Sequence, residues 1–123
     1  MLFRSLAEGL PRIEGDEARL VQVFVHVLNN AADAIESVGP KGRIVISTAM
    51  TDGRLQWRCA DTGPGVPSVD RVFDPFFTTK PPGKGTGLGL SVSYGIIREH
   101  GGEITCRNLA EGGAEFTITL PIK

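Results

Sequence analysis

The chain has 123 residues, 41% of them hydrophobic and 22% charged, which is the composition of one globular domain with its own core. The formal net charge of -1 provides neither a basic surface for nucleic acid nor a polybasic segment for a membrane, so we expect no nucleic-acid partner and no direct membrane contact. No apolar run approaches the length of a membrane helix, and Cys59 and Cys106 form no metal-binding pattern. We expect both thiols to be reduced and at least half-buried, as in a cytosolic protein.

In chain order, the sequence predicts paired strands, two helices and an irregular segment. Asp16 stands where a helix N-cap would, apolar residues recur three or four apart behind it, and Gly39-Pro40 ends that pattern. Asp52-Gly53 between two strand-like runs predicts a hairpin. The predicted elements are strands at 2–7 and 11–14 joined by a turn at 8–9, a helix at 16–37, strands at 43–50 and 55–60, a candidate helical turn at 68–72, a helix at 88–99, and strands at 103–108 and 115–120.

This order of elements does not have the strict strand–helix alternation of a parallel α/β protein. Hairpins account for most of the expected strand pairing. We therefore expect an α+β fold, an α/β sandwich whose mixed, mostly antiparallel sheet is covered by helices on one face, and we expect it to form a single domain over residues 1–123.

The first predicted helix carries a polar stripe. Gln22, His26, Asn30 and Asp33 are four, four and three residues apart, so they share one face of a helix that is otherwise apolar nearly all round. Such a helix should be mostly buried, and a buried polar group without a partner costs about 1–3 kcal/mol. Either the stripe faces solvent, or Asn30 offers its amide oxygen to a hard cation such as Mg²⁺ with Asp33 near the same site. The spacing alone does not separate these interpretations.

A sharp acidic turn, DTGPGVP, follows the strand predicted at 55–60 and runs from Asp61 to Pro67. Glycines beside a carboxylate let a ligand approach closely, so Asp61 would be able to accept a hydrogen bond from an exocyclic amine such as that of a purine. The alternative is an Asx-turn in which Asp61 binds its own backbone. The motif taken alone favours this second interpretation.

A glycine-rich run, TTKPPGKGTGLGLSV, leads from Thr78 into the second predicted helix. Glycines at a helix N-terminus leave unpaired backbone N–H groups open to a phosphate. The preceding FDPFF motif at 73–77 would anchor one end of a hinged lid. The alternative is a flexible surface loop, and the run has neither the Walker spacing nor the order of a dinucleotide fingerprint. The side chains that would add contacts to phosphate oxygens are those of Thr78, Thr79, Lys80 and Lys84.

Together, these motifs resemble the catalytic ATP-binding domain of sensor histidine kinases, within a superfamily that also includes gyrase and MutL ATPases. Four motifs match the N, G1, F and G2 boxes of that family, in order, within about residues 10–120. They are QVFVHVLNNAADAI (22–35), DTGPGVP (61–67), VFDPFFTTK (72–80) and GKGTGLGLSV (83–92), followed by HGGEI (100–104). The combination is most similar to kinases of the nitrogen-regulation and oxygen-sensing type.

The resemblance implies a Bergerat-type fold with about three helices and a flexible ATP lid, and it implies ATP and Mg²⁺ as cofactors. It also implies that Asn30 holds Mg²⁺, that Asp61 bonds the adenine amino group, and that His26 and Asn30 are the candidate catalytic residues. The candidate nucleotide-binding residues are Asn30, Asp33, Asp61, Gly63, Gly65, Val66, Phe77, Thr78, Thr79, Lys80, Gly85, Thr86, Gly87, Leu88, Gly89 and Leu90.

Two positions depart from the family pattern. The family often has asparagine where His26 stands, which leaves one cation or phosphate contact open. Many members have a basic residue where Asp33 stands, and a carboxylate cannot neutralise phosphate. We therefore expect Asp33 to reach a water bound to Mg²⁺ instead.

In such kinases the γ-phosphate passes to a histidine on a separate dimerisation domain, and indirectly to a response regulator. Neither His26 nor His100 has the sequence setting of a phosphoacceptor, so we expect the dimerisation domain to be a partner of this chain. The isolated domain is expected to be monomeric, inactive as a kinase without that partner, and cytoplasmic or the cytoplasmic part of a membrane-bound sensor. The alternatives are a nucleotide-binding regulatory module without kinase activity and an anti-sigma-type serine kinase.

Overall fold

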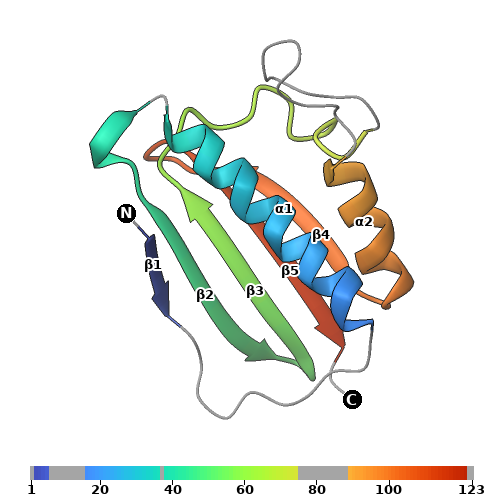
Figure 1. The fold of residues 1–123 in the computed structure, drawn as a ribbon. Coiled ribbons are helices and arrows are strands. Elements are labelled where there is room, and N and C mark those ends of the chain that lie inside the picture. Colours follow the sequence, from blue (N-terminus) through green and yellow to red (C-terminus); the bar gives the residue numbers. More distant parts are fainter. Residues whose placement is uncertain (1, 6–15, 37, 75–88, 122–123) are drawn as a thin grey trace.

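The computed structural model describes residues 2–5, 16–36, 38–74 and 89–121 (Figure 1). The strand expected at 11–14 and the turn at 8–9 lie outside these residues. The remaining strands and both helices occur within about two residues of their predicted ends, where the ends are described. The elements are β1 (Leu2–Ser5), α1 (Glu17–Glu36), the short 3-10 helix η1 (Gly39–Lys41), β2 (Ile44–Thr51), β3 (Arg54–Asp61), α2 (Gly89–Glu99), β4 (Glu103–Asn108) and β5 (Ala114–Pro121).

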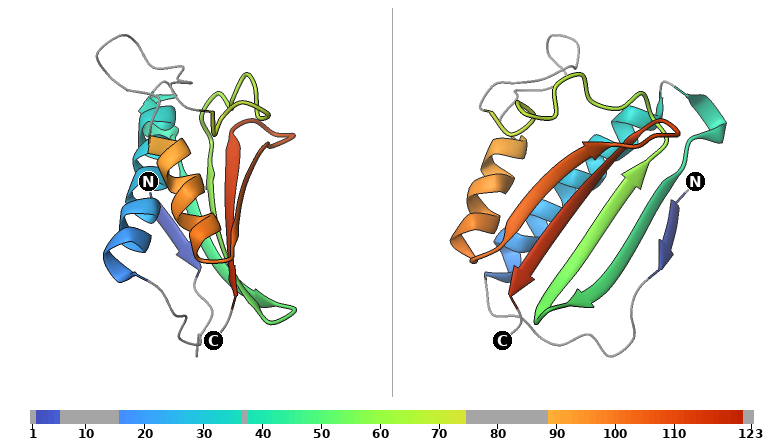
Figure 2. Two further views of the ribbon diagram at one scale, coloured as in Figure 1. Left: turned by 90° about the vertical axis from the view of Figure 1, so that its right-hand side faces the viewer. Right: turned by 180° about the vertical axis from the view of Figure 1, so that it is seen from behind.

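The strands form one five-stranded sheet in the order β1-β2-β3-β5-β4. Strand β1 pairs with β2 in parallel, and the other three pairings are antiparallel. Helices α1 and α2 both lie on one face of this sheet, which Figure 2 shows in the view from the side. The predicted α+β fold, with a mixed and mostly antiparallel sheet covered on one face, is therefore confirmed.

Local sequence signals account for the hairpin between β2 and β3. Thr51 is paired with Arg54, so the connection has only two residues. Both residues have positive φ, 50° at Asp52 and 74° at Gly53, as a two-residue turn that follows the twist of the strands requires. The hairpin predicted from Asp52-Gly53 is confirmed.

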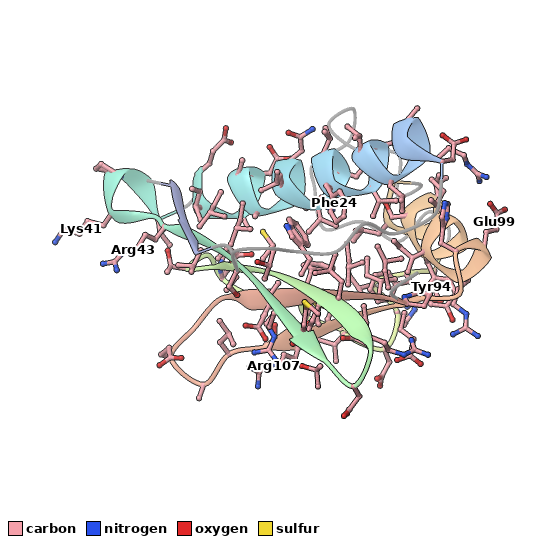
Figure 3. The ribbon with its side chains drawn as sticks, turned by 90° about the horizontal axis from the view of Figure 1, so that it is seen from below. Phe24, Lys41, Arg43, Tyr94, Glu99 and Arg107 are labelled. Atoms are coloured by element: carbon pink, nitrogen blue, oxygen red, sulfur yellow. The ribbon has the colours of Figure 1, made fainter. Side chains whose placement is uncertain are left out.

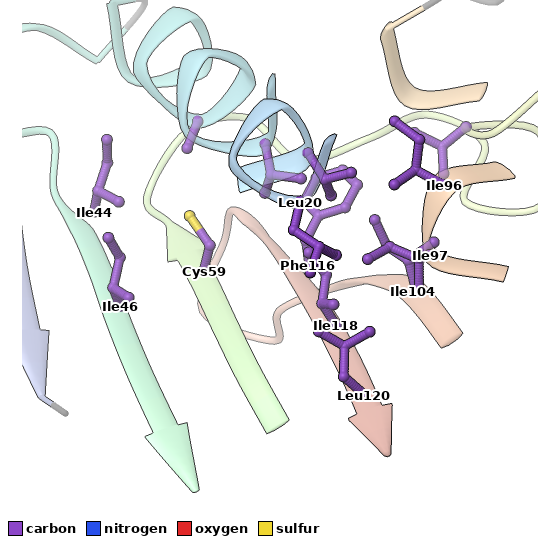
Figure 4. Close-up of a cluster of buried hydrophobic side chains, with 14 residues drawn as sticks. Leu20, Ile44, Ile46, Cys59, Ile96, Ile97, Ile104, Phe116, Ile118 and Leu120 are labelled. Carbon is purple, nitrogen blue, oxygen red and sulfur yellow. The ribbon is translucent and has the colours of Figure 1, made fainter. Parts of the chain in front are cut away.

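The core fills the space between the two layers (Figures 3 and 4). Alternate residues of β5 point toward the helices and are buried, and Val23 and Val27 of α1 and Ile118 of β5 are fully buried. Phe24 packs against Trp57 in a tilted arrangement, with ring centroids 4.9 Å apart. The expectation that α1 is mostly buried is wrong on one side, because Val21 and Val25 are about half exposed, at 50% and 47%.

Polar contacts join the start of α1 to the end of α2. The carboxylate of Asp16 accepts the N–H of Arg19 at 3.2 Å, so the predicted N-cap is confirmed. His100 Nε2 accepts the N–H of Asp16 at 3.0 Å, and its Nδ1 therefore donates to the carbonyl oxygen of Ile96 at 2.7 Å. An ion pair between Arg19 and Glu99 spans the same joint. These contacts fix α1 beside α2.

Residues 68–72, where we predicted a candidate helical turn, form part of consecutive turns that extend to residue 74. The N–H of Arg71 donates to Ser68 and the N–H of Asp74 donates to Arg71, at 3.1 and 2.9 Å. Phe73 then packs against Phe116 and Tyr94, with centroid distances of 6.1 and 5.6 Å. Phe73 thus anchors this segment to the core, whereas Phe76 and Phe77 lie outside the described residues. Neither helix in the described part of the chain is long and apolar enough to cross a membrane.

Substitutions at two adjacent glycines in the β4–β5 turn would distinguish the cost of an unfavourable backbone conformation from the cost of a steric clash. Gly112 and Gly113 both have positive φ, 105° and 94°, but a Cβ on Gly112 would meet nothing within 4 Å while one on Gly113 would lie 1.9 Å from the carbonyl oxygen of Asp61. We expect Gly112→Ala to destabilise the domain by about 1–3 kcal/mol and Gly113→Ala by more than about 4 kcal/mol, measured by urea unfolding. Equal losses would mean that this close approach does not constrain the fold.

Candidate functional site

One face of α1 connects two glycine positions that the sequence singles out. His26, Asn30 and Ala34 follow each other at intervals of four, so they share a face of α1. At one end, a Cβ on Gly89 would lie 3.0 Å from His26 Nδ1, and at the other, a Cβ on Gly63 would lie 2.7 Å from the carbonyl oxygen of Ala34. The face therefore extends from the first residue of α2 to the turn that follows β3, with Asn30 between these two contacts.

Asp61 ends β3 with a buried carboxylate that is 4% exposed. Its Oδ1 accepts the N–H of Gly63 at 2.9 Å and the N–H of Ala114 at 3.4 Å. The first of these bonds is the Asx-turn that we considered as an alternative, and the second comes from the neighbouring strand β5. Both bonds use the same oxygen, so an Asx-turn does not prevent Oδ2 from binding a ligand.

The surroundings of Asp61 oppose its ionisation. Burial raises the pKa of the Asp61 carboxyl above its usual value, and the N–H groups of Gly63 and Ala114 lower it in part. Burial and then the negative charge of Asp61 raise the pKa of Cys59 and of Cys106 to about 12. Both cysteines are free, one buried and the other half-buried, as expected for thiols that pack rather than react. A buried carboxylate with a perturbed pKa is typical of a functional site.

The turn after Asp61 is held at both ends by bonds that the sequence did not predict. Thr62 pairs with Arg43, whose N–H donates to the Thr62 hydroxyl at 2.8 Å and whose carbonyl oxygen accepts the Thr62 N–H at 3.1 Å. At the far end, Asn108 Oδ1 accepts the N–H of Val66 and Asn108 Nδ2 donates to the carbonyl oxygen of Val66, both at 2.7 Å. Asparagine is a common residue at the end of a strand, so no sequence signal distinguishes Asn108.

The four residues of the polar stripe on α1 differ in their exposure. Gln22 and Asp33 are exposed, as expected of a face toward solvent, whereas His26 and Asn30 are half-buried. His26 and Asn30 lie on the face of α1 that meets Gly63 and Gly89. The structure therefore brings these two polar residues toward the turn that follows Asp61. Among the described residues, no group of three His, Cys, Asp or Glu side chains is arranged to hold a metal ion without other ligands.

The second helix begins with residues of the candidate site. Gly89 is the first residue of α2, and the buried Ser93 hydroxyl donates to its carbonyl oxygen at 2.9 Å, which closes the first turn. Leu90 is half-buried against the core. Eight of the predicted site residues lie outside the described residues: Phe77, Thr78, Thr79, Lys80, Gly85, Thr86, Gly87 and Leu88.

The chain is similar in sequence to known proteins over most of its length. Residues 15–123 match the family described as histidine kinase-, DNA gyrase B-, and HSP90-like ATPase. The chain is 37% identical over 117 residues to the sensor histidine kinase ZraS of Escherichia coli O157:H7, covering 94% of this chain and 24% of ZraS. The chain thus spans about a quarter of the length of the curated relative that it matches.

Solved structures have the same fold. The catalytic domain of the histidine kinase ThkA, in a nucleotide-free form, has a TM-score of 0.83 and 33% identity over 98% of this chain and 79% of that domain. ThkA in complex with the response regulator protein TrrA has a TM-score of 0.78 and 30% identity, covering 99% of this chain and 34% of the ThkA chain. Full-length ShkA in complex with AMPPNP has a TM-score of 0.81 and 31% identity, covering 98% of this chain and 25% of ShkA.

The match over residues 15–123, the shared fold, and the buried aspartate beside the asparagine-bearing face of α1 lead to one conclusion. The chain belongs to the family of histidine kinase-, DNA gyrase B- and HSP90-like ATPases, as an ATPase domain of the sensor histidine kinase type.

Proposed function

We propose that this domain binds ATP with Mg²⁺ and supplies the γ-phosphate to a histidine on a separate dimerisation domain in two-component signalling. The observation that carries the proposal is the continuous face of α1 that contacts Gly89 at one end and Gly63, beside the buried Asp61, at the other. The crystal structures of full-length ShkA with AMPPNP and of ThkA with TrrA support a nucleotide ligand and, indirectly, a response regulator.

The base of ATP would bind at the turn after β3. Asp61 Oδ1 is held by two backbone N–H groups, so the orientation of Oδ2 is fixed as well and suits a hydrogen bond from the adenine amino group. Gly63 and Gly65 have no side chains that would keep the base away from this carboxylate, and Val66 offers an apolar, half-buried side chain. These residues form the adenine end of the proposed site.

The phosphates would lie toward the start of α2. The N-terminal backbone N–H groups of an 11-residue helix favour negative charge, and the absence of a side chain at Gly89 lets the His26 ring lie against the first residue of that helix. The lid residues that we predicted from the sequence precede this point in the chain and remain part of the proposal. His26 is accordingly proposed to contact the triphosphate from α1.

Mg²⁺ would be held by Asn30 together with oxygens of the nucleotide and water. The described donors fit this arrangement, because they offer an amide oxygen rather than a cluster of three metal ligands, and Mg²⁺ keeps several waters when phosphates bind it. When bound, the cation neutralises charge on the triphosphate. Asp33, exposed one turn along α1, is proposed to accept a hydrogen bond from a water of that ion.

The proposed acceptor of the phosphoryl group lies on another domain. Both ring nitrogens of His100 are engaged, with Asp16 and with Ile96, and His26 lies half-buried against Gly89. Phosphoryl transfer depends mainly on positioning and on charge neutralisation, so the isolated chain would bind ATP and transfer little. The free thiols of Cys59 and Cys106 suit the cytoplasmic location that we propose.

A phosphorylation assay with γ-labelled ATP and a purified dimerisation domain tests this function. We expect label on that domain that is stable in base and lost in acid, as phosphohistidine is. Acid-stable label on serine would support an anti-sigma-type kinase instead. ATP binding with no label on any partner would support a regulatory nucleotide-binding module.

Asn30→Ala tests the proposed cation ligand, and Asn29→Ala is the matched control because Asn29 is the neighbouring, exposed amide on α1. Asn30→Ala should weaken ATP binding about 10- to 100-fold in the presence of Mg²⁺ and much less in EDTA, since one ligand to a charged ion is lost. Isothermal titration calorimetry of both variants measures this. An equal effect with and without Mg²⁺ would remove Asn30 from the cation site.

Asp61→Asn tests the adenine contact. The amide keeps an oxygen that can accept the N–H groups of Gly63 and Ala114, but it presents a donor to the adenine amino group. We expect ATP affinity to fall about 10- to 100-fold, the range for a lost hydrogen bond to a charged group, and affinity for inosine triphosphate to fall less. A competition titration with the two nucleotides provides the comparison. Equal losses would assign Asp61 a structural role only.

The raised pKa of Asp61 predicts that Asp61→Asn, although it should weaken ATP binding, stabilises the nucleotide-free domain. A carboxyl whose pKa is higher in the folded state stabilises the fold when protonated, and this stabilisation is lost as the pH rises through the folded-state pKa. At pH 7, Asp61→Asn should therefore raise the melting temperature of the nucleotide-free domain, because the amide cannot ionise. The gain should disappear at a pH below the pKa of the carboxyl in the unfolded chain. Melting curves from pH 4 to pH 8 measure it, and a lower melting temperature at pH 7 would contradict it.

A further inference from the structure

We propose that Asn108 is a positioning residue that holds the adenine end of the site in shape, an inference that rests on the proposed function. Asn108 is the last residue of β4 and lies 42 positions beyond Val66 in the sequence. Its side chain nevertheless binds both backbone groups of Val66, accepting the N–H and donating to the carbonyl oxygen at 2.7 Å each.

Through these two bonds, the side-chain amide of Asn108 binds Val66 as the backbone of a neighbouring strand would. A residue inside a sheet exchanges an N–H and a carbonyl bond with its neighbour, and here the side-chain amide supplies both. Val66 therefore has its backbone satisfied without joining the sheet. The pair of bonds fixes the position of the chain and also the orientation of the peptide groups on either side of Val66.

Gly65 is shaped by the same contact. Its φ of +83° belongs to the left-handed region, and a Cβ at this position would lie 2.8 Å from Asn108 Oδ1. The turn can therefore pass this close to the amide only because residue 65 has no side chain. Gly65 and Asn108 fit one another, and both are needed for the path that the chain takes past the proposed adenine site.

The end of the β4–β5 hairpin that carries Asn108 also binds Asp61. Asn108 is paired with Ala114 across the β4–β5 hairpin, and the Ala114 N–H donates to Asp61 Oδ1. The turn between them closes through the N–H of Leu109, which donates to the carbonyl oxygen of Gly113 at 2.9 Å. One hairpin end therefore contacts the proposed base site at its carboxylate and at Val66, and only the Val66 contact depends on a side chain of that hairpin.

Asn108 can be changed without disturbing the core. Its side chain is exposed, and among the apolar side chains from Thr62 to Pro67 only that of Val66 packs against the core, half-buried at its edge. Arg107 offers a control from the adjacent position, because its exposed side chain lies on the face of the sheet opposite α1 (Figure 3) and pairs with Glu115, whose side chain is 12% exposed. Arg107→Ala removes a side-chain contact of β4 without touching the turn.

The test compares Asn108→Ala and Asn108→Asp with Arg107→Ala by calorimetric titration of ATP and ADP, with and without Mg²⁺. Asn108→Asp keeps the shape and the acceptor but replaces the donor with an oxygen that faces the Val66 carbonyl. We expect both Asn108 variants to bind ATP and ADP about tenfold more weakly, by the same factor for both nucleotides and whether or not Mg²⁺ is present. Arg107→Ala should bind as the unsubstituted chain does.

Two further measurements separate positioning from general loss of structure. The Val66 amide proton should exchange with solvent faster in Asn108→Ala, while the urea midpoint of unfolding stays near that of Arg107→Ala. Unchanged affinity in Asn108→Ala, a loss confined to Mg²⁺-containing samples, or a loss explained by a lower urea midpoint would each overturn the role of Asn108. A failure of the unsubstituted chain to bind ATP would instead overturn the proposed function, and this role with it.

Discussion

The burial of the Asp61 carboxylate at the end of the central strand is the constraint on which the rest of the site depends. Strand β3 lies between β2 and β5, so Asp61 is opposite Ile44 on one side and meets the N–H of Ala114 on the other. The carboxylate consequently has a fixed orientation before any ligand binds. Burial raises the pKa of this carboxyl, so the position costs stability when Asp61 is ionised.

The glycines around Asp61 follow from this placement. Two backbone segments and a helix approach one strand end, and a side chain at the contact points would separate them. Gly113 passes against the carbonyl oxygen of Asp61, and Gly63 passes against that of Ala34 on α1. The second contact brings the end of α1 that carries Ala34, one turn beyond Asn30, against the turn that follows the carboxylate.

Local patterns in the sequence predicted the parts of the fold that local interactions determine. The cap at Asp16 and the Asp52-Gly53 hairpin depend on residues only a few positions apart, and both occur as predicted. Contacts over long separations were not predictable in the same way: Asn108 binds Val66 across 42 residues. The exposure of Val21 was also missed, because periodicity identifies an apolar face without showing how much of it the sheet covers. For Asp61 the two interpretations were not exclusive, since one oxygen forms the Asx-turn and the other stays oriented for a ligand.

The two ends of the proposed site are held by different kinds of interaction. At the base end, backbone N–H groups and the Asn108 amide hold the turn, so its shape depends both on the sheet and on the Asn108 side chain. At the other end, the described contact is between the His26 ring and Gly89, where the absence of a side chain leaves room for the imidazole. A flat ring against a glycine can shift without breaking a hydrogen bond of the sheet. The described contacts therefore tie the base end of the proposed site to the sheet by hydrogen bonds, whereas the contact at the other end is one of packing.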